Sequence, residues 1–184
     1  PGSGEAGESE ETRQDAQLSE AFEGTEAAGR TGTDGAAEEE YVTEGTEEYR
    51  GFILDNVFHS REQGEIHFNL YVPESYDDSE PYAAFFTLPG YEGLYFQGVG
   101  ENLYNENFGF SARDYNDRMI VVAPQLSDWG MTSENQTIAL VEYILSHYNI
   151  DPDQVYGEGY SGGGNLFAED EEIMGWLFGR TSFM

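Results

Sequence analysis

The chain has 184 residues, of which 37 are acidic and 7 are basic, and its formal net charge is −30. A chain this negative repels phosphate backbones and anionic lipid headgroups, so we expect it to bind neither nucleic acids nor membrane surfaces. The lack of cysteine excludes disulfides, zinc–thiolate sites and a cysteine nucleophile in this sequence, and no apolar run is long enough to span a bilayer.

Residues 1–40 are predicted to be a disordered, self-repelling acidic linker. They are mainly Glu, Gly, Ala, Ser and Thr, and Phe22 is the only aromatic residue before Tyr41. Such a segment buries too little apolar surface to offset the entropy cost of ordering it. A linker of this kind favours an extracellular or bacterial cell-surface location, with a cytoplasmic location as the alternative. The folded domain is then predicted to cover residues 41–184.

The first half of this domain is predicted to consist of strands. Residues 50–58 and 65–72 alternate apolar and polar side chains, which is typical of two strands, and residues 59–64 form the hairpin loop between them. Residues 82–88 are a nearly continuous apolar run, as expected of a strand that is buried on both faces. The Pro- and Gly-containing segment 89–93 ends this strand.

The second half alternates helices and strands. Residues 108–118 are predicted to include a short helix, residues 119–123 a buried strand, and residues 154–158 a further strand after a turn at 151–153. Helical spacing over 135–148 puts four apolar side chains on one face: Ile138, Val141, Ile144 and Leu145. Apolar strands that alternate with helices indicate an α/β fold, with a mainly parallel sheet, helices on both faces and an N-terminal antiparallel hairpin.

One motif carries chemistry: Gly159-Tyr160-Ser161-Gly162-Gly163 matches G-x-S-x-G, the nucleophile elbow. In an elbow the serine sits on a tight strand-to-helix turn, and small residues two before and two after it let strand and helix come close. The backbone N–H after the serine then points into an oxyanion site. The alternative without a catalytic role is an ordinary glycine-rich turn between a strand and a helix.

A second segment, residues 88–93, leaves the end of a buried strand upstream of the motif. An esterase places its other oxyanion donor at this point. Pro89 has no N–H, so we expect the backbone N–H of Tyr91 to be the donor, with that of Glu92 less favoured. The alternative is a turn that only ends the strand.

The chain resembles the α/β-hydrolase superfamily, and more narrowly the secreted esterases grouped with polyhydroxybutyrate depolymerases and feruloyl esterases. The resemblance covers about residues 65–164, and four segments carry it: 71–76, 88–93, 121–125 and 159–164. It implies that Ser161 forms an acyl-enzyme with a small-molecule or polymer ester, that Gly162 and Tyr91 supply the oxyanion hole, and that Gly159 and Gly163 are the elbow glycines. It implies no cofactor and no metal.

The catalytic histidine of this family follows the serine in the chain, and no histidine follows Ser161 here. The three histidines all precede it, and we interpret His67 as a strand-surface residue and His147 as a helix C-terminal residue. The domain is therefore expected to be the N-terminal portion of the fold, incomplete at its C-terminus. Residues 165–184 form an atypical tail, and its apolar cluster 173–178 favours self-association.

Three functions remain open on these observations. The first is a serine esterase whose acid and histidine come from sequence not present here. The second is a non-catalytic hydrolase-like module for binding or assembly. The third is an acyltransferase, which would pass the acyl group to an alcohol instead of water.

Overall fold

The computed structural model describes residues 39–169. In this range it has seven strands and four α-helices, in the order β1 (Tyr41–Thr43), β2 (Glu47–Tyr49), β3 (Phe52–Ser60), β4 (Gly64–Tyr71), β5 (Tyr82–Leu88), α1 (Glu101–Tyr104), α2 (Phe108–Tyr115), β6 (Met119–Pro124), α3 (Met131–His147), β7 (Ile150–Gly159) and α4 (Gly162–Glu169). Two short 3-10 helices, η2 (Tyr91–Gly93) and η3 (Tyr95–Gln97), lie between β5 and α1.

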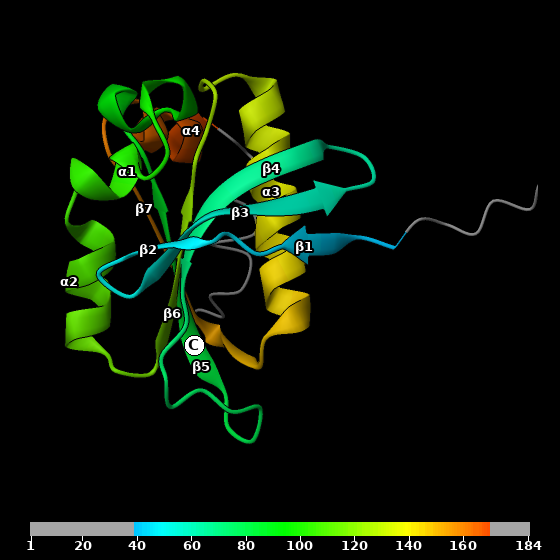
Figure 1. Cartoon of the computed structure of the whole chain (residues 1–184), viewed down its shortest axis with the longest axis vertical. Coiled ribbons are helices and arrows are strands. Elements are labelled where there is room, and N and C mark those ends of the chain that lie inside the picture. The colour runs from blue at the N-terminus through cyan, green and yellow to red at the C-terminus, as the bar shows by residue number, and fades with distance from the viewer. Residues whose placement is uncertain (1–38, 170–184) are drawn as a thin grey trace, which may run out of the picture. The chain divides into compact units, whose positions relative to one another are not determined.

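All the strands belong to one sheet, in the order β1-β3-β4-β6-β5-β7, with β2 also paired to β3. β5 is parallel to both β6 and β7, and β4 joins the antiparallel N-terminal strands to this parallel part through β6. Figure 1 shows α1 and α2 on one side of the sheet and α3 on the other. The predicted α/β class with an N-terminal antiparallel hairpin is confirmed.

The two central strands are buried on both faces, as their apolar sequences predicted. Every residue of β6 is buried, and so are all residues of β5 but one. One core cluster gathers around Leu140 and Ile144 of α3, and a second around Leu103 of α1 and Phe110 of α2. Each fully buried side chain of this size stabilises the fold by about 1.5–3 kcal/mol, so the two helical layers hold the parallel strands in place.

The turn of the N-terminal hairpin is shorter than predicted. β3 continues to Ser60 and β4 begins at Gly64, so residues 61–63 form the turn rather than 59–64. Gly64 has φ +72°, a left-handed conformation that favours glycine. β1 and β2 were not predicted, because three residues are too few to show alternation; both pair with β3 and enlarge the antiparallel part.

The last strand also differs from the prediction. The sequence predicted a turn at 151–153 and a strand at 154–158, whereas β7 spans Ile150–Gly159 and includes both. The predicted turn corresponds to an irregularity in the pairing with β5. Ile150 pairs with Tyr82, and the next paired residue of β7 is Val155, opposite Ala84. Among the described strands, β7 pairs only with β5. Residues 151–154 can therefore leave this ladder without breaking the pairing of another strand.

Helix α3 presents to the core a face that overlaps the predicted one only in part. Its fully buried residues are Ser133, Thr137, Leu140 and Ile144, of which only Ile144 was predicted; the predicted Val141 is half-buried and packs against the same core cluster. The hydroxyl of Thr137 donates to the Ser133 carbonyl at 2.7 Å, and that of Ser133 donates to Asp128 at 2.8 Å. Small polar residues can therefore occupy a buried helix face when nearby groups satisfy their hydrogen bonds. The spacing of apolar residues alone does not reveal such a face.

Two predicted segments lie largely outside the described residues. Of the linker 1–40, only residues 39 and 40 are described, and Glu40 accepts hydrogen bonds from the Ser60 hydroxyl at 3.1 Å and the Arg61 N–H at 2.9 Å. Of the tail 165–184, residues 165–169 belong to α4. The apolar cluster 173–178 lies outside, so its self-association stays a prediction.

The corrected face of α3 can be tested with two identical substitutions. Leu140→Ala is expected to lower the free energy of unfolding by about 2–5 kcal/mol, because it leaves a cavity in a fully buried position. Leu145→Ala, at a half-buried position of the same helix, is the matched control and is expected to cost clearly less. Urea unfolding followed by circular dichroism measures both, and equal losses would contradict the assigned face.

Candidate active site

Ser161 lies in a tight turn between β7, which is the edge strand of the sheet over residues 39–169, and helix α4. β7 ends at Gly159 and α4 begins at Gly162, so only Tyr160 and Ser161 connect them. Ser161 is exposed and has φ +52°, a left-handed conformation that costs a non-glycine residue about 1–2 kcal/mol. The N–H of Gly163 donates to the Tyr160 carbonyl at 3.0 Å and closes the turn. The backbone therefore has the strand–turn–helix geometry that an elbow requires, while the role of the serine stays a prediction.

The glycines of this turn allow three backbone segments to meet. A Cβ on Gly159 would lie 2.4 Å from the Gly163 carbonyl, and a Cβ on Gly163 would lie 2.7 Å from the Leu88 carbonyl oxygen. A Cβ on Gly162 would lie 2.1 Å from the Trp129 ring. A methyl group at any of these positions would force the neighbouring backbone or ring to move, so the glycine pattern follows from the packing of α4 on β7 and β5.

The loop after β5 runs beside this turn. The Leu88 carbonyl accepts the Tyr160 N–H at 3.1 Å, and the Pro89 carbonyl accepts a hydrogen bond from Trp129 Nε1 at 3.4 Å. Gly90 is buried so close to the Tyr160 ring that a Cβ would lie 2.6 Å from it. The loop and the turn that the sequence predicted to cooperate are thus in direct contact.

The backbone groups of this loop are paired one after another up to Tyr91. The Gly90 N–H donates to Glu106 Oε1 at 2.8 Å, and the Gly90 carbonyl accepts the Gly93 N–H at 3.0 Å. Within residues 39–169, the N–H groups of Tyr91 and Gly162 have no hydrogen-bond acceptor. These are the two donors that the sequence predicts for an oxyanion hole.

Two half-buried carboxyl groups lie next to the loop. Burial raises the pKa of the Glu106 carboxyl, the hydrogen bond from Gly90 lowers it in part, and the charges of Glu158 and Glu92 raise it further. Burial also raises the pKa of Glu158, and a hydrogen bond from the Thr87 hydroxyl at 2.9 Å lowers it in part. No arginine or histidine of the described segment forms an ion pair with either carboxyl.

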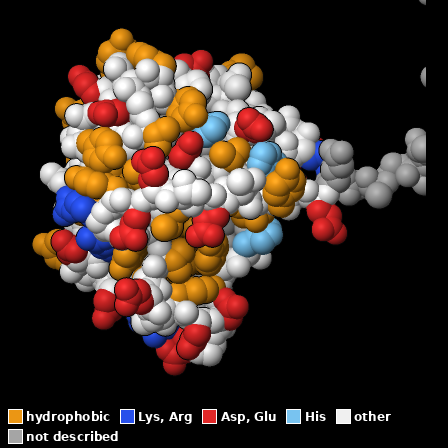
Figure 2. Space-filling view, in the orientation of Figure 1, with side chains coloured by type: hydrophobic (Ala, Val, Ile, Leu, Met, Phe, Trp, Pro, Cys, Tyr) orange, Lys and Arg blue, Asp and Glu red, His pale blue; other side chains and the backbone are white. Residues whose placement is uncertain are grey.

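An open cavity of about 520 Å³ adjoins the turn; its lining residues are Glu92, Asn105, Glu106, Asn107, Phe108, Ser111 and Tyr160. The rings of Phe108 and Tyr160 lie 6.4 Å apart, and both are partly exposed. A volume of this size suits a small organic group. Because the lining is aromatic and acidic, the cavity disfavours anionic substrates. The face in Figure 2 likewise carries carboxylates throughout and arginines in few places.

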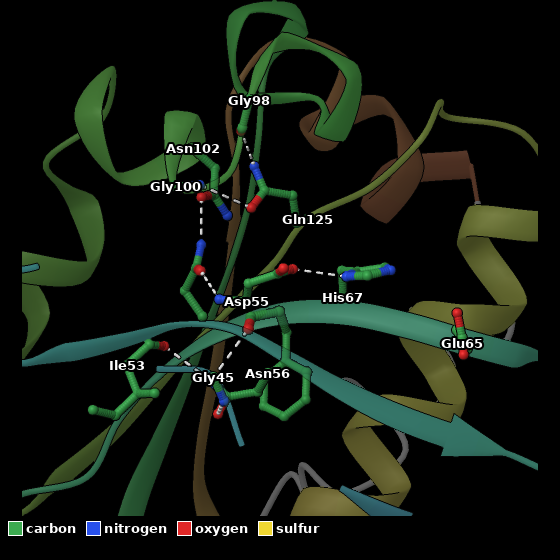
Figure 3. Close-up of polar contacts among 12 residues, drawn as sticks. Gly45, Ile53, Asp55, Asn56, Glu65, His67, Gly98, Gly100, Asn102 and Gln125 are labelled. Atoms are coloured by element: carbon green, nitrogen blue, oxygen red, sulfur yellow. Dashed lines mark hydrogen bonds and ion pairs between the residues drawn. The ribbon is translucent and has the colours of Figure 1, made fainter. Parts of the chain in front are cut away.

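His67 is part of a carboxylate–histidine pair, but not at the elbow. Its Nδ1 lies 2.7 Å from Asp55 Oδ1, and its ring stacks on Tyr95 with centroids 4.3 Å apart. Figure 3 shows this pair on β3 and β4. β6 and β5 separate β4 from β7, and three strand spacings of about 4.8 Å place His67 roughly 14 Å from the strand that precedes Ser161. His67 thus lies on a strand, as predicted, but is paired with Asp55, and it does not reach the serine.

Buried amide side chains beside this pair hold the segment before α1 on the sheet (Figure 3). Asn69 donates to Asn102 at 2.7 Å, and Gln125 accepts from the Gly100 N–H at 3.0 Å and donates to the Gly98 carbonyl at 2.8 Å. Loss of one partner would leave a buried polar group unsatisfied, at a cost of about 1–3 kcal/mol. The network therefore supports the elements that flank the cavity.

The other two histidines are further from the turn. His59, on β3, stacks on Tyr41 with ring centroids 4.3 Å apart. His147 ends α3, as predicted, and stacks on Tyr143 at 3.8 Å. It comes just before β7, whereas Ser161 follows the opposite end of this ten-residue strand, a separation on the order of 25 Å. Among the described residues, none of the histidines is placed as a base for Ser161.

Sequence reasoning missed three residues that surround the turn: Glu106, Trp129 and Glu158. Glu106 and Trp129 belong to connecting segments without a recognisable spacing, so no local signal marks them. Glu158 directly precedes the motif, and an acidic residue near the end of a predicted sheet strand was the available signal.

The described part of the chain contains no group of three or more His, Asp and Glu side chains that could hold a metal ion. Over residues 39–169, none of the helices is long and apolar enough to cross a membrane.

Comparison with known proteins supports the fold. No protein-family model and no curated protein matches the chain. Among solved structures, it is similar to a thermostable esterase, with a TM-score of 0.51 and 23% identity over 67% of this chain and 39% of that chain. It is also similar to a putative acetyl xylan esterase from Bacteroides fragilis, with a TM-score of 0.51 and 13% identity over 74% of this chain and 45% of that chain. The chain thus spans less than half the length of either structure and shares the α/β-hydrolase fold with them.

The steric role of the glycines can be tested by adding one methyl group. Gly159→Ala is expected to lower the free energy of unfolding by about 1–3 kcal/mol, because its Cβ would overlap the backbone of Gly163. Gly130→Ala is the matched control, since its Cβ would meet only Asp128 at 3.5 Å, an ordinary contact. Thermal unfolding measures both variants, and a Gly159→Ala protein as stable as Gly130→Ala would refute the close approach.

Proposed function

Since the chain has the α/β-hydrolase fold, we propose that it carries the nucleophile of a serine hydrolase that acts on carboxylic esters. The observation that supports this most directly is the left-handed backbone of exposed Ser161 between β7 and α4, against the loop at Gly90. The Ser161 hydroxyl attacks the ester carbonyl, the bond to the alcohol oxygen breaks as that oxygen takes up the proton, and water then hydrolyses the acyl-enzyme.

The N–H groups of Tyr91 and Gly162 are proposed to bind the oxyanion of the tetrahedral intermediate. Both lack an acceptor within residues 39–169, and Gly162 begins α4, where helical N–H groups have no partner inside the helix. One such donor contributes about 2.7–4 kcal/mol to transition-state stabilisation in serine hydrolases. The proposed reaction requires no cofactor.

The general base is proposed to come from polypeptide beyond these 184 residues. Serine needs a base to become an effective nucleophile, and His59, His67 and His147 all lie away from Ser161. The two similar esterase structures are more than twice as long as the matched part of this chain, which leaves room for such residues. We further propose a small-molecule or polymer ester as substrate and an extracellular or cell-surface location.

The main alternative is a non-catalytic hydrolase-like binding module. The separation of Ser161 from every histidine of the described range favours it. The two functions differ in one property of this chain: only a hydrolase needs an oxyanion hole that stabilises a developing negative charge.

A cysteine at position 161 makes this property measurable without a base. The chain has no native cysteine, so Ser161→Cys carries a single thiol. Acylation of this thiol by p-nitrophenyl acetate forms an oxyanion, whereas alkylation by iodoacetamide does not. The ratio of acylation rate to alkylation rate therefore reports the oxyanion hole. We expect this ratio to be at least about tenfold higher than for an exposed thiol, because one donor changes such rates by about 10²–10³-fold.

Ser75→Cys is the matched control, since Ser75 is an exposed serine in the loop after β4. Intact mass and peptide mapping confirm which residue is modified. Equal ratios at positions 161 and 75 would sink the hydrolase proposal and leave the binding module.

A further inference from the structure

Glu106 lines the cavity and binds the loop that carries the proposed oxyanion donor. It lies in the connection between α1 and α2, and its Oε1 accepts the Gly90 N–H at 2.8 Å. Gly90 directly precedes Tyr91, so this hydrogen bond acts one peptide unit before the N–H that would bind the oxyanion.

The backbone of Gly90 is held on both sides. Its N–H is bound by Glu106, and its carbonyl accepts the Gly93 N–H at 3.0 Å. The Gly90 carbonyl and the Tyr91 N–H belong to one planar trans peptide unit and point in opposite directions. Fixing the carbonyl therefore also fixes the direction of the Tyr91 N–H, and the Glu106 bond prevents Gly90 from rotating about its own φ.

Because residue 90 is a glycine, its backbone needs the hydrogen bond to Glu106 in addition to the one within the loop. Gly90 has no side chain to restrict its conformation, and a Cβ would lie 2.6 Å from the Tyr160 ring and 3.5 Å from Glu106 Oε1. A residue that must be glycine for steric reasons also has a more flexible backbone than other residue types. A hydrogen bond from outside the loop compensates for this flexibility.

We propose that Glu106 is a positioning residue, whose carboxylate holds Gly90 and thereby aims the Tyr91 N–H at the oxyanion. This inference rests on the proposed function and assigns a residue that acts through the backbone, not on the substrate itself.

The charge of Glu106 is unfavourable for stability. Its carboxyl is half-buried and faces Glu158 of β7, Glu92 of η2 and the ring of Tyr160, and no described cation pairs with it. Burial and these charges raise its pKa, so protonation favours the folded state. This stabilisation is complete below the ordinary pKa and is lost as the pH rises through the raised pKa. The carboxylate is, however, the stronger acceptor for an N–H.

The test uses the Ser161→Cys chain and its ratio of acylation to alkylation. Glu106→Ala is expected to lower the ratio at least about tenfold, because the Tyr91 N–H loses its fixed direction. Glu106→Gln is expected to keep it within about threefold, since the amide oxygen can accept the same N–H. Asp114→Ala removes an exposed charge from α2 and is expected to leave the ratio unchanged. A change in thiol reactivity caused by the lost charge alters both rates alike and therefore leaves their ratio unchanged.

Two further readouts separate positioning from a general loss of structure. The amide resonance of Gly90 should titrate with Glu106, at a pH above the ordinary range of a glutamate, and this titration should vanish in Glu106→Gln. The melting temperature of Glu106→Gln should exceed that of the parent at neutral pH, and the difference should shrink as the pH falls.

The outcomes are distinct. A high ratio in Ser161→Cys that Glu106→Ala does not change would overturn the positioning role and leave the proposed function standing. A Gly90 resonance that does not respond to Glu106 would overturn it as well. A ratio in Ser161→Cys no higher than in Ser75→Cys would overturn both.

Discussion

The close approach of three backbone segments at the carboxyl ends of the parallel strands is the constraint on which the site depends. Gly159 and Gly163 allow α4 to fold back on β7, and Gly163 also meets the end of β5 at Leu88. This contact sets the left-handed backbone of Ser161. Because the loop after β5 begins at the same point, the geometry of the turn also determines where the Tyr91 N–H can lie.

The site combines several features that each reduce stability. Ser161 has a strained backbone, Gly90 is flexible by nature, and Glu106 and Glu158 are half-buried carboxyl groups without a described cation. The two core layers on either side of β5 and β6 stabilise the sheet and so tolerate these costs. Strained backbone conformations cluster at active sites, which agrees with the role proposed for Ser161.

The sheet order explains why a carboxylate–histidine pair in this chain does not complete a catalytic triad. His67 and Asp55 are well oriented toward each other, but they lie on the antiparallel part of the sheet, with two strands between His67 and β7 and three between Asp55 and β7. Ser161 lies at the edge strand, where any further part of the sheet would join. The general base proposed above for Ser161 is therefore expected on that side rather than on the N-terminal hairpin.

The sequence by itself determined the α/β class, the buried strands β5 and β6, and the glycine-framed turn at Ser161, because each rests on local pattern: continuous apolar runs, and glycines at fixed spacing. Only the tertiary structure decided which residues of α3 are fully buried, since Ser133 and Thr137 are satisfied by local hydrogen bonds, whereas the expected Val141 and Leu145 are only half-buried. It also decided that Glu106 holds Gly90. Glu106 and Gly90 are 16 positions apart, and the segment between them has no periodicity, so no sequence pattern predicts their contact.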